Sequence, residues 1–265
     1  MTTVTYAQIA GIPGWFYRMD VGAFRVLLDE TAVRLSGGDL AEMGVYQGRS
    51  AVLLGSYLQS GEVLTVIDLF GAEAGDVANG RENREQYAEL TRKQFEGAYR
   101  AIHEVLPVVV QDFSSAITDH ASHGTHRFVH IDASHLYEHV VGDIAAARTL
   151  LKTDGVVVLD DYQSGHTPGV AAAAWQAVSA GLHPFLLTNA KMYATWGDAT
   201  IWKKAIDTWV TNSSYGHERQ TIGDDEVVRV WSNPRKIARF PRKIARFIPP
   251  AAMPSLSRLR ARIGK

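Results

Sequence analysis

The sequence contains no cysteine, which excludes disulfide bonds, thiolate metal sites and cysteine nucleophiles. It also lacks a run of about 18 apolar residues, so a membrane-spanning helix is not expected. The segment from Met1 to Ala10 has no basic region followed by an apolar stretch, so no secretion signal is indicated. A cytoplasmic location is therefore the expectation, and peripheral contact with a membrane is left open by the carboxyl-terminal tail.

Acidic residues are absent from that tail. Between Pro234 and Lys265 lie ten Lys and Arg and no Asp or Glu, so the preceding residues hold 17 basic against 28 acidic side chains, a formal charge of −11. The heptapeptide that begins at Pro234 recurs from Pro241, and this second proline would interrupt a helix through both copies. An anionic membrane, an acidic partner protein or the acidic body of a second subunit could attract the tail, or it is a solvated segment. No motif for specific nucleic-acid binding accompanies it.

Length and composition favour one large globular domain, because 265 residues with 46% hydrophobic side chains can bury a substantial core. Apolar runs rich in β-branched residues alternate with helical patterns, which is typical of a doubly wound α/β sheet with buried parallel strands. The predicted strands are 39–44, 63–68, 108–111, 128–132 and 155–160, and the predicted helices are 50–58, 81–105, 113–121 and 136–151.

Two further segments extend this alternation. Residues 9–35 combine a loop with a helical apolar pattern and predict a helix that covers the sheet. Residues 184–188 and 191–196 flank Asn189-Ala190 and predict an antiparallel hairpin. The expected fold is a Rossmann-like, mostly parallel sheet of seven strands that ends in this hairpin. We divide the chain into a covering helix and substrate cap (1–38), a main domain (39–233) and the basic tail (234–265).

A glycine-rich turn follows the first predicted strand, where open α/β sheets usually bind their ligands. Gly44 and Gly48 allow a tight turn and a close approach of the backbone to a ligand. The exposed amides at the start of the next helix favour an anionic group. Asp68 ends the following strand, where its carboxylate can accept both hydroxyls of a ribose. The Gly-x-x-x-Gly spacing differs from that of dinucleotide sites, and a tight turn without a ligand is the alternative.

Three carboxylates follow two later strands: Asp132 comes after one, and Asp160 and Asp161 come after the next. Adjacent parallel strands lie about 4.8 Å apart, so carboxylates at their carboxyl ends can share one cation. Oxygen ligands suit Mg²⁺, and Ca²⁺ or Mn²⁺ could substitute. The alternative is that these residues cap the helices that follow. A cation is favoured because three acids beside an anionic cofactor would otherwise repel one another.

The turn carries the motif Glu-x-Gly-x-Tyr-x-Gly-x-Ser, formed by Glu42, Gly44, Tyr46, Gly48 and Ser50. With this motif the sequence resembles class I methyltransferases that use S-adenosylmethionine (SAM), specifically the metal-dependent branch with catechol, macrolide and polysaccharide sugar O-methyltransferases. The resemblance runs from residue 39 to residue 196. It implies a SAM site at the five motif residues, Asp68, Asp132 and, beside the adenine, Phe113 and Ser114, and a Mg²⁺ site at Asp132, Asp160 and Asp161.

His135 lies three residues after Asp132, in the pattern Asp-x-x-His-x-Tyr-Glu. Catechol-type relatives carry a lysine base at this offset and many sugar-modifying relatives carry a histidine. The resemblance therefore implies that His135 is a general base or an orienting group for a metal-bound hydroxyl, with a structural histidine as the alternative. His130 is expected to be a satisfied buried residue, and Glu138 and Asp143 to form local salt bridges.

Aromatic residues outside the main strands bear on the acceptor. Their faces suit a sugar ring, although they could instead anchor the covering helix and the hairpin. The segment 71–80, a candidate flap, also indicates an acceptor larger than a catechol. The expected function is Mg²⁺-dependent methyl transfer from SAM to a hydroxyl of a sugar or oligosaccharide. A phenol or catechol acceptor, an NAD(P)-dependent oxidoreductase and a non-catalytic module are the alternatives, and a homo-oligomer is left open. The aromatic residues are Trp15, Phe16, Tyr17, Tyr162, Tyr193 and Trp196.

Overall fold

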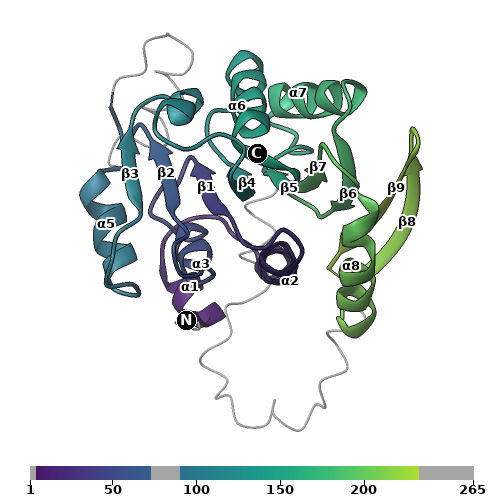
Figure 1. Cartoon of the computed structure of the whole chain (residues 1–265), viewed down its shortest axis with the longest axis horizontal. Coiled ribbons are helices and arrows are strands. Elements are labelled where there is room, and N and C mark those ends of the chain that lie inside the picture. Colours follow the sequence, from purple (N-terminus) through teal and green to yellow (C-terminus); the bar gives the residue numbers. More distant parts are fainter. Residues whose placement is uncertain (1–3, 73–89, 233–265) are drawn as a thin grey trace, which may run out of the picture. The chain divides into compact units, whose positions relative to one another are not determined.

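The computed structural model describes residues 4–72 and 90–232, which are built around one nine-stranded sheet (Figure 1). Its strand order is β3-β2-β1-β4-β5-β7-β6-β9-β8. The strands from β3 to β5 in this order are all parallel, whereas β7 runs antiparallel to both of its neighbours. The strands are β1 (Asp39–Met43), β2 (Leu64–Asp68), β3 (Val108–Gln111), β4 (His126–Ile131), β5 (Leu151–Leu159), β6 (His183–Leu187), β7 (Met192–Thr195), β8 (Gly216–Ile222) and β9 (Asp225–Trp231).

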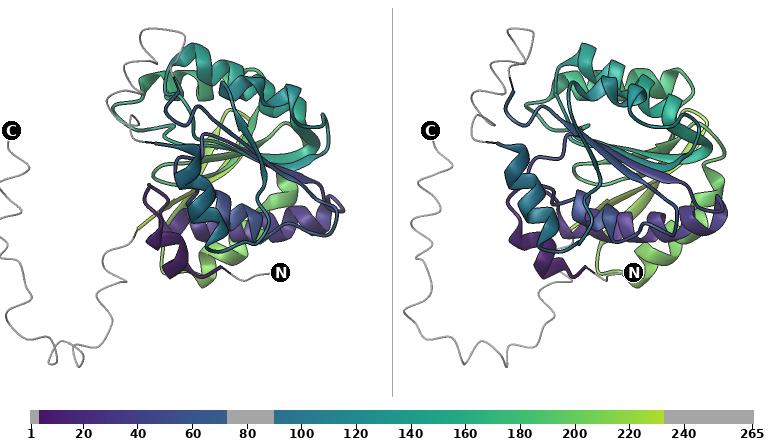
Figure 2. Two further views of the ribbon diagram at one scale, coloured as in Figure 1. Left: turned by 90° about the vertical axis from the view of Figure 1, so that its left-hand side faces the viewer. Right: turned by 60° about the vertical axis from the view of Figure 1, so that its left-hand side comes forward.

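Helices cover both faces of this sheet, as the edge-on views show (Figure 2). The buried side chains accordingly form two cores, one on each face. One core contains residues of α1 (Tyr6–Gly11), α2 (Arg18–Arg34), α3 (Ala51–Gly55), α5 (Arg92–Arg100) and α8 (Thr200–Asn212). The other contains residues of the 3₁₀ helix η1 (Ser114–Asp119), α6 (Tyr137–Leu150) and α7 (Pro168–Ser179).

The predicted fold class is confirmed, but the predicted number of seven strands is wrong. The order from β3 to β6 contains the five predicted parallel strands and the predicted hairpin, and the hairpin of β8 and β9 extends its edge. β9 pairs with β6 in parallel and buries Val227, Val228 and Val230. β8 carries mostly exposed polar residues and lies at the edge of the sheet, so it has no apolar alternation that would predict a strand.

Two predicted helices are shorter than expected. The segment 113–121 forms only the 3₁₀ helix η1. The segment 81–105 contains α5, which ends at Arg100, while residues 81–89 lie outside the described part. Residues 73–80 of the candidate flap and the basic tail also lie outside it, so their roles and the division at residues 38 and 233 stay predictions. Within the described segments, no helix combines the length and apolar character needed to cross a lipid bilayer.

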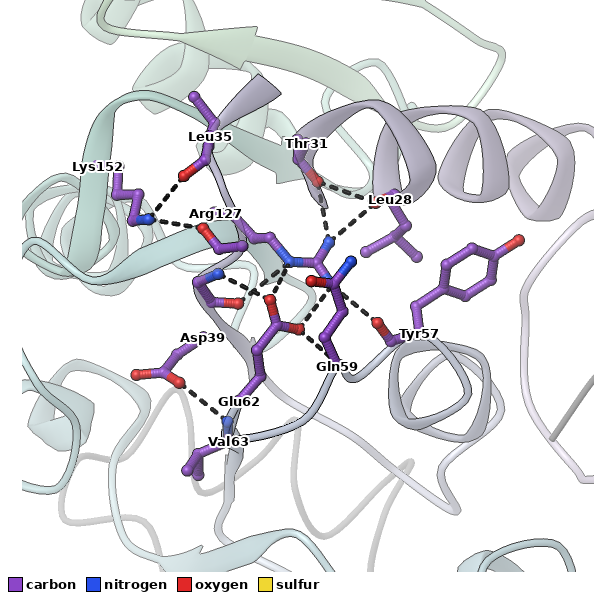
Figure 3. A network of polar contacts seen from close by, with 12 residues as sticks. Leu28, Thr31, Leu35, Asp39, Tyr57, Gln59, Glu62, Val63, Arg127 and Lys152 are labelled. Carbon is purple, nitrogen blue, oxygen red and sulfur yellow. Dashed lines mark hydrogen bonds and ion pairs between the residues drawn. The ribbon is translucent and has the colours of Figure 1, made fainter. Parts of the chain in front are cut away.

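A buried ion pair fastens the covering helix α2 to the sheet (Figure 3). The guanidinium of Arg127, at the start of β4, lies 2.9 Å from Glu62 and donates to the carbonyls of Leu28 and Tyr57 and to the hydroxyl of Thr31. Burial raises the pKa of Glu62, but hydrogen bonds from Arg127 and two backbone amides lower it below its ordinary value. These contacts lie at the amino-terminal ends of the parallel strands, which leaves the opposite ends for the site described next.

Candidate active site

A cavity of about 280 Å³ lies at the carboxyl ends of β1, β2, β3 and β4. The strand order reverses at β1, and this is the place where open α/β sheets bind ligands. The walls come from the turn after β1, the end of β2, the start of η1 and the first turns of α6. Of the residues predicted from the sequence, Gly44, Tyr46, Ser50, Asp68, Phe113, Ser114 and Asp132 line this cavity.

Glycine is required at Gly44 for two reasons. Its φ of +78° lies in the left-handed region, and a Cβ at this position would overlap the backbone of Asp132. Gly48 also has a positive φ, and a Cβ there would press on the ring of Phe95. The turn therefore lies directly against the end of β4, which brings the glycine motif and the first predicted metal ligand together.

Asp68 holds this turn in place. Its carboxylate accepts hydrogen bonds from the amides of Val45 at 2.8 Å, Tyr46 at 3.0 Å and Phe70 at 2.8 Å. Burial raises the pKa of Asp68, and the three amides offset part of this effect. A carboxylate has about four acceptor positions, so about one remains for a ribose hydroxyl. The structure thus gives Asp68 an orienting role that the sequence did not indicate.

Glu42 lies behind the turn and not on the wall of the cavity. It is fully buried, and one carboxylate oxygen accepts the hydroxyl of Ser50 and contacts Nδ1 of His130 at 2.7 Å. Burial raises the pKa of Glu42 to about 8, although the Ser50 hydroxyl and the Lys191 ammonium oppose this shift. Glu42 therefore supports the turn from below, while Ser50 also reaches the cavity.

Two of the three predicted metal ligands meet at the sheet edge. Asp132 and Asp160 follow the paired strands β4 and β5, and their ligand atoms lie within 4.8 Å of each other and of a ring nitrogen of His130. Burial, and then the neighbouring Asp160 carboxylate, raise the pKa of Asp132 well above its usual range. Asp161 is oriented differently, because its carboxylate accepts the hydroxyl of Ser164 at 2.6 Å.

A buried lysine that sequence reasoning missed completes this cluster. Lys191 is 1% exposed, and its ammonium forms an ion pair with Asp160 and lies 3.0 Å from Nε2 of His130. Burial lowers the pKa of Lys191, but the carboxylates of Asp160, Asp132 and Asp20 together raise it above its ordinary value, so the side chain is charged. The signal in the sequence was a lysine at the start of an otherwise apolar strand.

The charge of Lys191 also fixes the state of His130. Burial, and then this ammonium, lower the pKa of His130 well below its usual value, so the ring is neutral. Nδ1 then donates to Glu42, and Nε2 accepts from Lys191. The prediction that His130 is a satisfied buried residue is confirmed, and its nitrogens are not left for a cation.

The acidic cluster fits a divalent cation. Asp132 and Asp160 place two carboxylates against each other, Asp161 adds a third nearby, and the single ammonium of Lys191 offsets only part of their charge. The available donors are carboxylate oxygens, which Mg²⁺ prefers. Asp132 and Asp160 would hold such an ion, and Asp161 stays the predicted third ligand.

His135 lies at the border of this cluster. Its Nε2 is 3.5 Å from the carboxylate of Asp161, and the side chain is partly exposed. Glu138 is exposed and lines the cavity. The prediction of a local salt bridge at Asp143 is wrong: this residue is fully buried on the cavity side of α6, and within residues 4–72 and 90–232 it forms no ion pair.

The predicted aromatic residues divide into two groups. Trp15 is 63% exposed, lines the cavity and packs on Tyr46 with 5.5 Å between the ring centroids. Tyr17, nearby in the chain, is also exposed. The other predicted aromatic residues are buried in the two cores or pack against them, and so anchor the covering helix and the hairpin: Phe16, Tyr162, Tyr193 and Trp196.

The comparisons with known proteins agree with this geometry. Residues 41–162 match a family described as a methyltransferase domain. None of the curated proteins is a significant match. The structure is similar to that of the O-methyltransferase NovP, with a TM-score of 0.53 and 16% identity over 67% of this chain and 79% of that one. It is also similar to CalS11, a calicheamicin methyltransferase, with a TM-score of 0.51 and 18% identity over 69% and 81% of the two chains. For a protein from Corynebacterium glutamicum the TM-score is 0.50, with 18% identity over 74% and 93%.

The fold is therefore that of class I O-methyltransferases. Residues 41–162 match a methyltransferase domain, which confirms the resemblance to class I methyltransferases stated from the glycine motif, while the metal-dependent branch stays a prediction. The alternative of a nicotinamide-dependent oxidoreductase loses its support, because the matched domain includes the turn and the strands that would have carried that cofactor.

Proposed function

We propose that this protein transfers the methyl group of SAM to a hydroxyl oxygen of a sugar, with Mg²⁺ at the acidic cluster. The observation that carries this proposal is the meeting of the glycine turn with the end of β4, which puts a cofactor cavity and the paired carboxylates of Asp132 and Asp160 at one edge of the sheet. A likeness in fold to an O-methyltransferase, NovP, supports an oxygen acceptor.

SAM would lie across the carboxyl ends of the strands. Its anionic carboxylate suits the amides of the turn between Gly44 and Gly48. Its ribose would lie near Asp68, and its adenine near Phe113 and Ser114. This order places the sulfonium methyl group at the end of the cavity nearest Asp132, which lines the cavity and also belongs to the acidic cluster.

The reaction requires a hydroxyl oxygen in line with the methyl group and a group that takes its proton. A bound Mg²⁺ would lower the pKa of the acceptor hydroxyl and fix its position. Asp132 and Asp160, with Asp161 as the predicted third ligand, would hold the ion there, and Lys191 keeps Asp160 oriented through their ion pair. His135, beside Asp161, accepts the proton while the oxygen–carbon bond forms and the sulfur–carbon bond breaks, which leaves S-adenosylhomocysteine (SAH).

The rim of the cavity supports a sugar acceptor. Trp15 presents an exposed ring face at the rim, and Tyr17 follows it in the chain with a second exposed ring. Aromatic faces of this kind suit the apolar face of a sugar ring. A phenol could stack on the same residues, so the acceptor has to be tested directly.

The test is a panel of sugars, nucleotide sugars, phenols and catechols incubated with the full chain, isotopically labelled SAM and Mg²⁺. We expect the label in one or more sugars and little in the phenols, and Trp15→Ala should raise KM for that sugar more than it lowers kcat. Labelling of phenols alone would overturn the sugar assignment. Absence of SAM and SAH binding in calorimetry would overturn the proposed function itself.

A further inference from the structure

The covering helix α2 carries a buried carboxylate that the proposed chemistry does not use. Asp20 lies in the first turn of this helix and is 2% exposed. Its Oδ1 accepts the hydroxyl of Thr188 at 2.7 Å and the hydroxyl of Tyr193 at 2.8 Å. Burial raises the pKa of Asp20, and the Lys191 ammonium and these two hydroxyls oppose the shift. A buried carboxylate is costly unless it is paired and hydrogen-bonded, so its partners indicate its role.

The two hydroxyl partners of Asp20 lie on either side of Lys191 in the hairpin. Thr188 follows β6, and Tyr193 lies in β7. The hydroxyl oxygen of Thr188 also accepts the backbone amide of Lys191 at 3.0 Å. The ring of Phe16, just before α2, has its centroid 5.6 Å from the Lys191 ammonium. The beginning of the covering helix therefore surrounds the buried lysine with a carboxylate and an aromatic face.

Lys191 is shared between Asp20 and the acidic cluster. Its ammonium forms an ion pair with Asp160, so a divalent cation at Asp132 and Asp160 has to compete with it for the Asp160 carboxylate. Burial lowers the pKa of Lys191, whereas the three carboxylates of Asp160, Asp132 and Asp20 raise it. Within residues 4–72 and 90–232, Asp20 does not belong to the group of side chains whose ligand atoms could meet at one cation. It attracts the ammonium without supplying a ligand.

We propose that Asp20 is a positioning residue that acts through Lys191: its carboxylate is a second counter-ion for the ammonium and keeps Asp160 available to a divalent cation. This inference rests on the proposed function, because it needs the cation at Asp132 and Asp160. Without the negative charge of Asp20, the ammonium depends more strongly on Asp160, and the cation has to displace a stronger ion pair. The covering helix thus contributes to metal binding although it supplies no ligand.

The test is calorimetric titration of the full chain with Mg²⁺, in the wild type and in Asp20→Asn. The carboxamide has the same size and its oxygen can still accept both hydroxyls, so the substitution removes the charge and keeps the packing of the hairpin. We expect Mg²⁺ to bind at least about fivefold more weakly, the lower end of the usual coupling between two sites. The affinity for SAH should stay within a few fold of the wild type.

A double-mutant cycle shows whether Asp20 acts through the ammonium. In the Lys191→Met background, Asp20→Asn should weaken Mg²⁺ binding by a factor at least about threefold smaller, because the shared ammonium is gone. Asp20→Ser removes the same charge with a smaller polar group and should weaken Mg²⁺ binding to a similar extent. It serves as the second variant where Asp20→Asn does not fold.

Asp29→Asn is the matched control. Asp29 also lies on α2, but it is exposed, and the charges that act on it include those of Arg127 and Arg25. Its Mg²⁺ affinity should stay within about twofold of the wild type, because solvent and salt screen an exposed charge.

The outcomes separate this inference from the proposed function. Unchanged Mg²⁺ affinity in Asp20→Asn, or an undiminished effect in the Lys191→Met background, overturns the inference and leaves the proposed function standing. Equal weakening in Asp29→Asn shows a general effect of charge and also overturns it. A wild type that binds SAH but no Mg²⁺ overturns the inference together with the proposed metal site.

Discussion

Replacing Lys191 by methionine tests whether the acidic cluster holds a divalent cation. The substitution keeps most of the side-chain volume but removes the ammonium that is paired with Asp160. The carboxylates of Asp132 and Asp160 then lie together in a buried place without a protein cation. Removing one partner of a buried ion pair costs about 3–5 kcal/mol, because the remaining charge is left uncompensated. We therefore expect a loss of this size in the free energy of unfolding without metal.

Millimolar Mg²⁺ should restore part of this loss. A ligand that binds only the folded state at about 100 times its dissociation constant adds about 2.7 kcal/mol. Mg²⁺ should raise the free energy of unfolding of Lys191→Met more than that of the wild type, because the variant site lacks the positive charge of the ammonium and binds the cation more tightly. Denaturant unfolding followed by tryptophan fluorescence, with and without Mg²⁺, measures both free energies.

Lys152→Met is the control for this prediction. Its ammonium is also partly buried, but it donates to the carbonyls of Leu35 and Gly37, beside the Arg127 network and away from the acids. We expect Lys152→Met to be destabilised without any added effect of Mg²⁺. If Mg²⁺ stabilises Lys191→Met no more than Lys152→Met, then the carboxylates do not form a cation site and the reasoning is refuted.

Three other predictions follow from the structure. Arg127→Met should lose about 3–5 kcal/mol in urea unfolding because Glu62 is left unpaired, and its affinity for SAH should stay within a few fold of the wild type because the pair lies away from the cavity. The pKa of Asp143 is raised from 3.8 to about 7 in the folded protein. Below pH 3.8 the group is protonated in both the folded and the unfolded state, so its ionisation does not affect stability. Between pH 3.8 and 7 the unfolded state ionises more readily, so the folded protein is progressively destabilised. The stability of Asp143→Asn relative to the wild type should therefore increase across this window by up to about 4 kcal/mol, and a flat difference between pH 4 and 7 would contradict the shift. His135→Ala should lower kcat by about 10²- to 10⁴-fold with little change in the KM of the acceptor, and an unchanged kcat would remove His135 from the mechanism.

The sequence predicts the parallel half of this fold because its strands are buried on both faces. The end of β5 is a continuous apolar run, and β1, β2 and β4 carry apolar residues on both faces, so both these strands and the acids that follow them can be located without coordinates. The glycine turn is equally local, since the positive φ of Gly44 is a requirement of the turn itself. β8 could not be found in this way, because an exposed edge strand carries no apolar pattern.

The residues that were missed depend on contacts between distant parts of the chain. Lys191 meets Asp160 only because β7 pairs with β5 in antiparallel register, and no local pattern shows that pairing. Asp68 was placed correctly, but its three backbone amides come from a turn more than twenty residues earlier and from Phe70. Asp143 did leave a local signal: it lies in line with Val140, Ile144 and Ala147 on the buried stripe of α6, where an acid without a partner is unusual.

The central claim is that a metal-binding carboxylate cluster lies beside the methyl group of bound SAM. Its most direct test is methyl transfer to the sugar found in the acceptor panel, measured for the wild type and Asp160→Asn with Mg²⁺ and after exhaustive chelation, with SAH binding measured on the same samples. We predict SAH affinities within a few fold of one another in all four cases, and turnover only in the wild type with Mg²⁺. Turnover that survives chelation, or that persists in Asp160→Asn, would contradict the claim.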